Sequence, residues 1–376
     1  MKTDRFLKNS VFRLIIIGII LTCVLILVPT GYEDALIYQD AERVKAEILS
    51  VDNSSVRSSG LIQSGEQKCE ILVKSGLFKG KEIEGVNFLT GSLEEDKIFD
   101  AGDVCLATIS HSGEEITSCI LTDHYRLDKE IILLGLFFAL LIIFAGKNGF
   151  LAIFSFVITI LTVWKVLVPA YLNGANPVWT GINITIFLTI IIIFFVYGFD
   201  KRTLSAVLGS LLGIFTTCIM GIIFTDLFKI HGAVMSHSES LLYSGYQDLN
   251  LTSVFMSSIF IGASGAMMDL SVDITSAVNE VVEKKPDIGW KEAARSGMNV
   301  GRAAMGTMTT TLLLAYSGSY ITLLMVFMAQ GTPIDHILNY KYVSSEILHT
   351  VIGSFGLVTV APFTALVSAF MLTKKR

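Results

Sequence analysis

Two aspartates lie four residues apart in the stretch GASGAMMDLSVD (residues 262–273), which otherwise reads as part of a membrane-spanning helix. On a helix, Asp269 and Asp273 project from one face, and Glu280 continues that face seven residues after Asp273. The remaining residues of the face are small or polar, namely Gly262, Gly265, Ala266, Ser276 and Ala277. We therefore expect this face to meet protein or water, with Gly262 and Gly265 as helix-packing positions.

A carboxylate at membrane depth can take up and release a proton, because its ionised form is costly there and the neutral form comes within reach. Counting about 1.5 Å per residue from Leu251 places Asp269 roughly 27 Å along the span, near the inner edge of the hydrocarbon. Asp273 then lies closer to the cytoplasm. The pattern predicts proton coupling at Asp269, with Asp273 and Glu280 as further candidates.

A structural interpretation of these acids stays open. The next apolar stretch offers hydroxyls that could hold Asp269 permanently, from Thr307, Thr309, Thr310, Thr311 and Ser317. Thr307, Thr310, Thr311 and Ser276 are therefore the supporting polar residues that we expect near the acid. For Asp273 and Glu280, the neighbouring Lys284 and Lys285 favour a solvated helix end.

Other polar residues indicate less chemistry. Glu346 and His349, one turn apart, could accept protons, but an interfacial position would also explain them. His231, His237 and Glu239 lack metal-ligand spacing. No nucleophile with a base and an orienting group appears, and no nucleotide motif. We therefore expect no enzymatic activity, no cofactor and no metal.

The composition requires a membrane to hold these residues. Of 376 residues, 52% are hydrophobic and only 16% are charged, and the mean hydropathy is +0.64, which predicts an integral membrane protein. The lipid bilayer is thus the first partner, and nothing supports binding to nucleic acid. The first apolar run, residues 11–29, follows Lys2, Arg5 and Lys8 and is too long for an ordinary signal peptide, so residues 1–30 are expected to form an uncleaved anchor.

A polar segment, residues 31–128, separates the anchor from the other spans. Short alternating runs bounded by Gly, Asp and Ser predict five strands, at 43–51, 68–75, 81–89, 103–110 and 115–122. Five strands at this spacing indicate a small all-β, OB-like barrel or sandwich. Its three cysteines, Cys69, Cys105 and Cys119, permit at most one bridge inside the domain, and none is assumed.

Residues 129–376 read as a seven-span helical membrane domain. The expected spans are 131–146, 149–170, 178–198, 203–226, 251–280, 303–329 and 346–371, which makes about eight with the anchor. Between the fifth and the sixth of these, residues 284–302 carry Pro286, Trp290 and Lys291 in a pattern typical of an amphipathic helix on the inner interface, with an ordinary solvated linker as the alternative.

The loop charges predict the orientation. Basic residues gather in the short segments on one side, namely Lys2, Arg5, Lys8, Lys147, Lys201, Arg202, Lys284, Lys285, Lys291, Arg295, Arg302, Lys374, Lys375 and Arg376. The short loops of the other side hold only Lys229 and Lys341. The positive-inside rule therefore places both termini in the cytoplasm and residues 31–128 outside a bacterial plasma membrane.

The stretch from SGAMMDLSVDITSAVNEVVEKKPDIGW to GRAAMGTMTTTLLL, followed by GSFGLVTVAPFTALVSAF, resembles the YibE/F-like family of bacterial multi-pass membrane proteins. The resemblance extends to VKSGLFKGKEIEGVNFLTG and FDAGDVCLAT in the polar segment. It implies a membrane protein and says little about chemistry.

The single anchor, the outer domain, the span that begins DKRTLSAVLGSLLGIF and the inner-loop sequence KEAARSG are similar, more distantly, to one half of the RND transporters and of the SecD and SecF translocation subunits. This similarity implies that Asp269, or Asp273 one turn on, belongs to a proton pathway. It also implies that one chain is half of a functional unit, hence a homodimer or a heterodimer with a related chain. The chain departs from that pattern in its two extra spans (131–170), its smaller outer domain and its single aspartate at the position where RND pumps often have two.

Two functions remain open. The first is a proton-coupled secondary transporter, or an energy-transducing membrane subunit, acting on an unknown small-molecule, lipid or peptide substrate. The alternative is a membrane scaffold or receptor that does not transport, in which the outer β-domain binds a partner.

Overall fold

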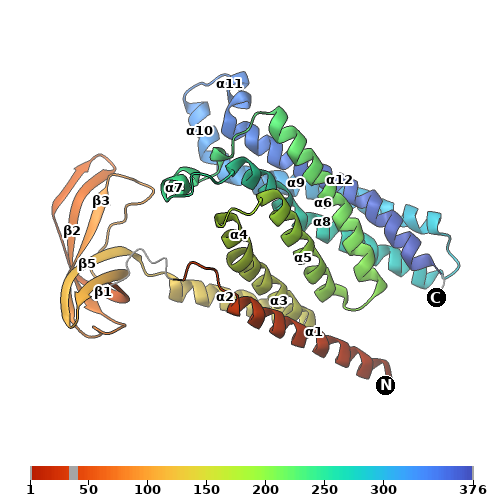
Figure 1. Cartoon of the computed structure of the whole chain (residues 1–376), viewed down its shortest axis with the longest axis horizontal. Helices are drawn as coiled ribbons and strands as arrows, with labels where there is room; N and C mark the ends of the chain where they lie inside the picture. Colours follow the sequence, from red (N-terminus) through yellow and green to blue (C-terminus); the bar gives the residue numbers. More distant parts are fainter. Residues whose placement is uncertain (1, 34–40, 375–376) are drawn as a thin grey trace. The chain divides into compact units, whose positions relative to one another are not determined.

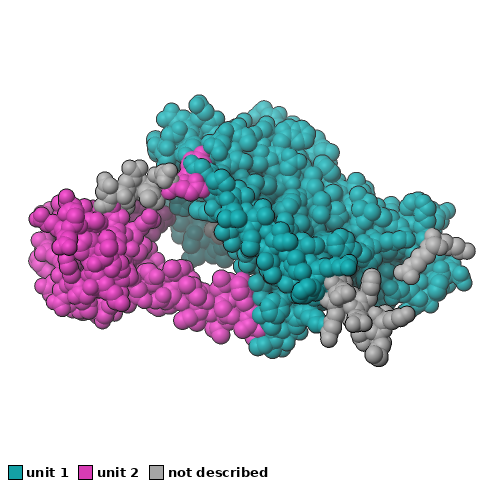
Figure 2. Space-filling model, turned by 60° about the horizontal axis from the view of Figure 1, so that its bottom comes forward, with its two compact units in different colours: residues 1–31, 141–376 teal, residues 32–140 magenta. Residues whose placement is uncertain are grey.

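The computed structural model describes residues 2–33 and 41–374, and it describes side chains for all of these except residues 2–10 and 319. Residues 34–40 of the predicted outer domain, and the basic residues Lys375 and Arg376, lie outside the described residues. The chain divides into two compact units, one of residues 1–31 and 141–376 and the other of residues 32–140, which Figure 2 colours separately. The polar unit therefore extends past the predicted boundary at residue 128, because it includes most of a helix that follows the last strand.

The polar unit contains five strands, as predicted, and they form a closed barrel, one of the two arrangements that the sequence left open. They are β1 (Ala41–Ser59), β2 (Ile62–Val73), β3 (Glu82–Thr90), β4 (Val104–Ser112) and β5 (Glu115–His124). The barrel order is β1-β2-β3-β5-β4, with β1 paired to β4 and all pairs antiparallel except β3 with β5. Alternate residues point inward, as in the Val44, Ala46 and Ile48 series of β1, and form one apolar core.

The strands β1 and β2 are longer than the sequence predicted. They continue as a hairpin beyond Val51, and Gly60 turns the chain with a φ of +64° that few other residues tolerate. The residues of this extension are mostly polar and exposed, from Asp52 to Ser59, so they carry no apolar alternation that would have revealed it.

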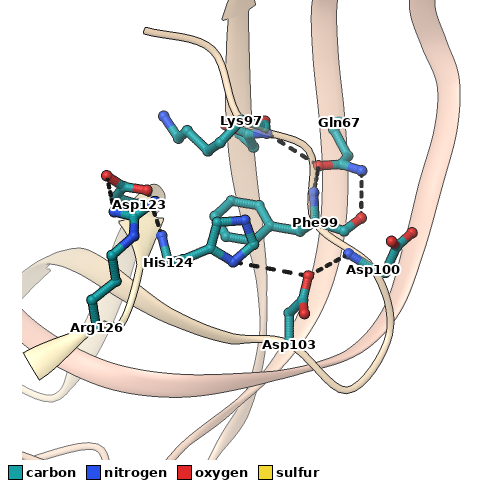
Figure 3. Close-up of polar contacts among 9 residues, drawn as sticks. Gln67, Lys97, Phe99, Asp100, Asp103, Asp123, His124 and Arg126 are labelled. Carbon is teal, nitrogen blue, oxygen red and sulfur yellow. Dashed lines mark hydrogen bonds and ion pairs between the residues drawn. The ribbon is translucent and has the colours of Figure 1, made fainter. Parts of the chain in front are cut away.

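A buried polar pair joins β2 to β3 inside the barrel. Gln67 and Asn87 are fully buried and lie opposite one another on the two strands. The Gln67 amide group donates to Phe99 O at 2.9 Å and accepts from Phe99 N at 3.1 Å (Figure 3). Asn87 Nδ2 donates to Lys97 O at 2.6 Å. The pair thus anchors the segment between β3 and β4 against the barrel.

The three cysteines of the barrel are buried, and each is a free thiol. Burial raises the pKa of Cys69 to about 11 and those of Cys105 and Cys119 to about 12. Thiolates are the reactive form, so these side chains behave as small apolar core residues.

Two residues separate the end of β5 from the helix α2 (Leu127–Ala145). Its first turn is tied to the barrel by an ion pair between Lys45 Nζ and Asp128 Oδ2. Asp123, at the end of β5, pairs with Arg126 at 2.7 Å, and this contact lowers the pKa of the aspartate. None of the residues of α2 is buried.

The helical unit contains α1 (Lys2–Leu27), a nearly continuous helix of α3 (Lys147–Thr162), a π turn (Val163–Leu167) and α4 (Val168–Leu172), then α5 (Pro177–Tyr197), α6 (Lys201–Leu227), α7 (Ser238–Tyr243), α8 (Leu251–Lys284), α9 (Trp290–Ser317), α10 (Ile321–Ala329), α11 (Ile334–Asn339) and α12 (Lys341–Thr373). The helix α8 packs against α5, α6, α9 and α12, and α12 also packs against α6 and α9 (Figure 1).

Within the described residues, five of the expected spans are long and apolar enough to cross a membrane without a break: 147–172, α5, α6, α8 and α12. The apolar part of α1, Val11–Leu27, is shorter. The helix α2 is not among the five, because its first turn holds three charged residues, Asp128, Lys129 and Glu130, which shorten its apolar part. The composition of the chain and these helices identify a membrane protein of about five clear spans.

The expected span 303–329 is not one continuous helix. The helix α9 ends at Ser317, a 3-10 turn follows at Gly318–Tyr320, and α10 leaves at an angle of 69°. The glycine and the two serines in the sequence YSGSY are poor helix formers, which makes this a natural place for a break.

Residues 284–302 do not form a separate interfacial helix. The helix α8 ends at Lys284, and after a short turn α9 runs from Trp290 without interruption past residue 302. Small residues recur on one face of α9 at Ala293, Gly297 and Gly301. A β-carbon on Gly301 would lie 3.0 Å from that of Ala361, so these residues let α9 pack closely on the bundle.

Candidate functional site

The acidic residues predicted from the sequence lie on α8, which packs against α5, α6, α9 and α12. Hydroxyl pairs fix α8 against α12: Ser271 Oγ lies 3.0 Å from Thr364 Oγ1, and Thr275 Oγ1 lies 2.9 Å from Ser368 Oγ. All four side chains are buried. These pairs set the register between the two helices, and the sequence analysis missed them because single Ser and Thr residues are common in membrane helices.

One stripe of α8 stays exposed although most of the helix is packed. Its members have small or acidic side chains, namely Gly262, Gly265, Asp269, Asp273, Ser276 and Glu280. On one side of the stripe, Met268 and Val272 belong to an apolar cluster with Ile193 of α5. On the other side, Ala266 packs into the cluster that includes Met305 and Met308 of α9. The stripe therefore lies between the sides of α8 that face α5 and α9.

Contacts between α5 and α8 show how far Asp269 lies from the ends of a membrane-spanning helix. With 21 residues it is about 30 Å long, close to the thickness of the hydrocarbon. Its last residue, Tyr197, has its hydroxyl 2.6 Å from both Val272 O and Ser276 Oγ, and near its other end a β-carbon on Gly181 would lie 2.9 Å from Ser257 Cβ. Asp269 is three to seven residues from the level of Tyr197, or about 5 to 10 Å inside that end of α5.

Asp269 makes no hydrogen bond or ion pair within the described residues, and its side chain is exposed on the isolated chain. The hydroxyls expected to hold it serve their own helix instead. Thr307, Thr310 and Thr311 donate to backbone oxygens of α9 at 2.9 to 3.1 Å. Asp269 therefore has the geometry of an acid whose partner is a proton, water or another molecule.

The other two acids differ in their surroundings. Glu280 pairs with Lys284 at 2.6 Å at an exposed end of α8. Asp273, one turn from Asp269, lies close to the level of Tyr197 and acts electrostatically on both Asp269 and Tyr197. Ser276, predicted as a supporting residue, contacts Tyr197.

The two glycines of the stripe also differ. A β-carbon on Gly262 would lie 2.8 Å from Tyr316 Oη and 3.5 Å from His349 Nε2, so this glycine allows close packing. At Gly265 no atom would lie within 4 Å, and the structure has open space where a helix contact was expected.

The geometry offers proton binding more readily than other chemistry. Among residues 2–33 and 41–374, no group of three or more His, Cys, Asp or Glu side chains is placed to hold a metal ion. On one side of α8 the stripe presents the carboxylates of Asp269 and Asp273 and the hydroxyl of Ser276. These groups can bind a proton or a cationic group. They do not include a nucleophile paired with a base.

Comparison with known proteins gives one result that identifies the chain. Searches among curated proteins and among solved structures give no match. The model of the family described as YibE/F-like protein matches residues 133–374, which include α8, the acidic stripe and most of α2. Since this match covers more than half of the chain, the protein belongs to the YibE/F-like family.

Proposed function

We propose that this protein is a proton-coupled secondary transporter or an energy-transducing membrane subunit, in which Asp269 binds and releases the proton. The observation that carries the proposal is the Asp269 carboxylate, which has no partner among the described residues. It belongs to a membrane-spanning helix, about 5 to 10 Å along that helix from the level of Tyr197, the last residue of α5.

The energetics of such a group support a function. A charged side chain at membrane depth costs a few kcal/mol even on the lenient insertion scale, and acids in these positions usually take part in transport or proton transfer. A permanent structural role would require hydrogen-bond donors, but the hydroxyls of α9 are engaged with their own backbone. The open space at Gly265, one turn from Asp269, leaves room for water or a partner.

The orientation belongs to the same proposal. A cavity of about 780 Å³ is lined by Asp200, Lys201, Asp287 and Lys374, so the α5–α6 turn, the segment after α8 and the end of α12 share one end of the bundle. A second cavity, of about 430 Å³, is lined by residues of the α4–α5 turn and of the segment before α8, such as Asn176 and Asn250. Short loops at the first end carry most of the basic residues, which supports a cytoplasmic location for that end.

Eight spans and an outer barrel complete this topology. Counting α1, α2 and the bent pair of α9 and α10 as crossings brings the barrel to the side opposite the basic loops. In that position the barrel would handle the substrate, for which the sequence leaves small molecules, lipids and peptides open.

A second copy of the chain, or a related chain, is the proposed partner. An exposed stripe of small residues allows two helices to approach closely. A partner there would cover Asp269, and cross-linking of a cysteine placed at Gly265 in native membranes tests this arrangement.

The test of the function is proton movement in liposomes that contain a pH-sensitive dye. We expect Asp269→Asn to lower proton flux across a pH gradient to the level of protein-free vesicles, while Asp269→Glu keeps part of it. Glu283→Gln is the matched control, because Glu283 belongs to the same helix but lies exposed at its end, where it accepts a hydrogen bond from Asn279. Equal flux in the wild type and Asp269→Asn would contradict the proposal and favour the scaffold function.

A further inference from the structure

A second group of titratable side chains lies in the bundle, on the same face of α8 as Asp269. Its members are Glu346 and His349 of α12, one turn apart. The His349 ring stacks on Tyr316 of α9, with ring centroids 4.4 Å apart and planes 25° apart, and meets Phe255 of α8 edge-on at 6.3 Å. Residues of α8 and α9 therefore contact this histidine of α12, for which the sequence had left an interfacial position open.

Both side chains have a buried polar atom without a hydrogen-bond partner. They are Oε1 of Glu346 and Nε2 of His349. An unsatisfied buried polar atom costs about 1–3 kcal/mol, so native proteins keep few of them and often at functional positions. Asp269 also lacks a hydrogen-bond partner within the described residues, but its side chain is exposed, whereas these two atoms of Glu346 and His349 are buried.

The surroundings of the pair contain no fixed counter-charge within the described residues. Tyr316 and Tyr320 are the titratable groups that interact electrostatically with Glu346, and the backbone of Ser258 on α8 interacts with the His349 ring. From α6, Met220 and Phe224 pack into the apolar cluster beside this part of α12. A proton is therefore the ion best suited to neutralise Glu346.

Gly262 connects this pair to the stripe of Asp269. His349 Nε2 lies 3.5 Å from the position of a β-carbon on Gly262. From Gly262 to Asp269 is seven residues, or two turns of α8 and about 10 Å along the helix. Between them is Gly265, with open space on the same face. Nothing on the helix itself separates the two acidic positions.

We infer that Glu346 and His349 form a second proton-binding site, which exchanges protons between Asp269 and the side of the membrane where α12 begins. This inference rests on the proposed function. In each step one bond to hydrogen breaks and one forms. A hydronium ion outside gives a proton to the Glu346 carboxylate and becomes water, and the carboxyl gives the proton to the His349 imidazole. The imidazolium then gives it to water beside Gly265, which passes it to the Asp269 carboxylate. A gap of about 10 Å needs about three hydrogen-bonded waters.

The residue that tests the connection without removing a titratable group is Gly265. We expect Gly265→Leu to lower proton flux at least tenfold, because the side chain fills the space beside the stripe, while Gly265→Ala keeps the flux. If the space at Gly265 faces only lipid, Gly265→Leu has wild-type flux and the route past this residue is wrong.

The pair itself is tested by infrared spectroscopy of the full chain in nanodiscs across a pH series, together with liposome flux. We expect two separate carboxylic acid bands, one lost in Glu346→Gln and the other in Asp269→Asn. Glu346→Gln and His349→Gln should each lower flux at least tenfold, since positioned proton-transfer groups typically contribute a hundredfold or more. Asp335→Asn, an exposed acid on α11, is the control and should leave flux and bands unchanged.

The outcomes separate this inference from the proposed function. Flux that depends on Asp269 but is unchanged in folded Glu346→Gln and His349→Gln overturns the second site and leaves the function standing. Flux independent of Asp269 overturns the function. If Glu346→Gln fails to fold, as judged by size-exclusion chromatography, His349→Gln and the wild-type band titration decide; a wild type with a single titrating band overturns the inference.

Discussion

The barrel and the helical bundle treat polar side chains in opposite ways. In the barrel, the Gln67 amide uses both donors and its oxygen, with partners in Asn53, Asn87 and Phe99. In the bundle, Asp269 has no partner and Glu346 and His349 each keep a buried atom without one. Complete hydrogen bonding is what a structural role requires, whereas groups left open can bind something that comes and goes.

The contrast has one exception on each side. Asn87 Oδ1 is buried in the barrel without a partner, although the amide nitrogen of that residue makes two hydrogen bonds. In the bundle, the hydroxyl pairs of α8 and α12 are as complete as any contact of the barrel. The contrast therefore holds between individual sites with and without complete hydrogen bonding, and not between the two units as wholes. The hydroxyl pairs of α8 and α12 belong to the complete sites, so we interpret them as structural.

The largest effect on stability is expected in the barrel. Gln67→Leu leaves the backbone N–H of Phe99 and the Asn87 amide without their partner, so we expect it to destabilise the barrel by about 3–5 kcal/mol. Hydrogen exchange of β2 and β3 in the full chain, measured by mass spectrometry, gives the change. Glu70→Gln, on an exposed position of the same strand, is the control. Wild-type protection in Gln67→Leu would mean that the polar pair is dispensable.

A pair of glycine substitutions compares packed and open surfaces of the bundle. A β-carbon on Gly209 would lie 2.8 Å from Thr364 Cα on α12, a backbone atom that cannot move aside easily. We expect Gly209→Ala to destabilise the protein by about 1–3 kcal/mol. Gly265→Ala should be neutral or should stabilise by up to about 1 kcal/mol, because alanine favours the helix and meets no neighbour. Thermal unfolding of both variants in detergent measures the difference, and equal midpoints would contradict it.

Neutralising the two unpartnered acids of the bundle should affect stability less than the Gln67 and Gly209 substitutions do. Asp269→Asn and Glu346→Gln remove no hydrogen bond of the folded chain, so we expect changes within about 1 kcal/mol together with the loss of flux. The same thermal measurement checks this. A large destabilisation would indicate that these acids hold the bundle together, and the contrast with Gln67 would fail.

The smallest effect concerns one loop of the barrel. Backbone N–H groups of Thr90, Gly91 and Ser92 donate to the Asp96 carboxylate at 2.7 to 3.0 Å, and these bonds lower its pKa below 3.8. A lowered folded pKa stabilises the loop above the unfolded pKa, and the stabilisation is lost as pH falls through the folded value. Exchange of the three amides should therefore speed up selectively below about pH 4. Asp96→Asn should remove this pH dependence.

Local patterns were sufficient for much of this fold. The five strands followed from alternation and from Gly and Asp turns, because a half-buried strand must present apolar residues at every second position. Five of the expected spans followed from apolar length, and the α8 stripe followed from helical spacing alone. The break after Ser317 was missed, because the residues around it are apolar enough to continue a span. The continuous start of α9 was missed, because the amphipathic pattern of residues 290–302 is the same for a surface helix and a packed one.

By itself, the sequence determined that Asp269 lies within an apolar helix and shares a face with small residues, since both follow from composition and a period of 3.6. Only the tertiary structure decided which polar groups have partners. The threonines of α9 turned to their own backbone, and α12 brought His349 against Gly262 across 87 positions of sequence. Hydrogen-bond partners depend on distances between helices, and no local pattern in the chain encodes those distances.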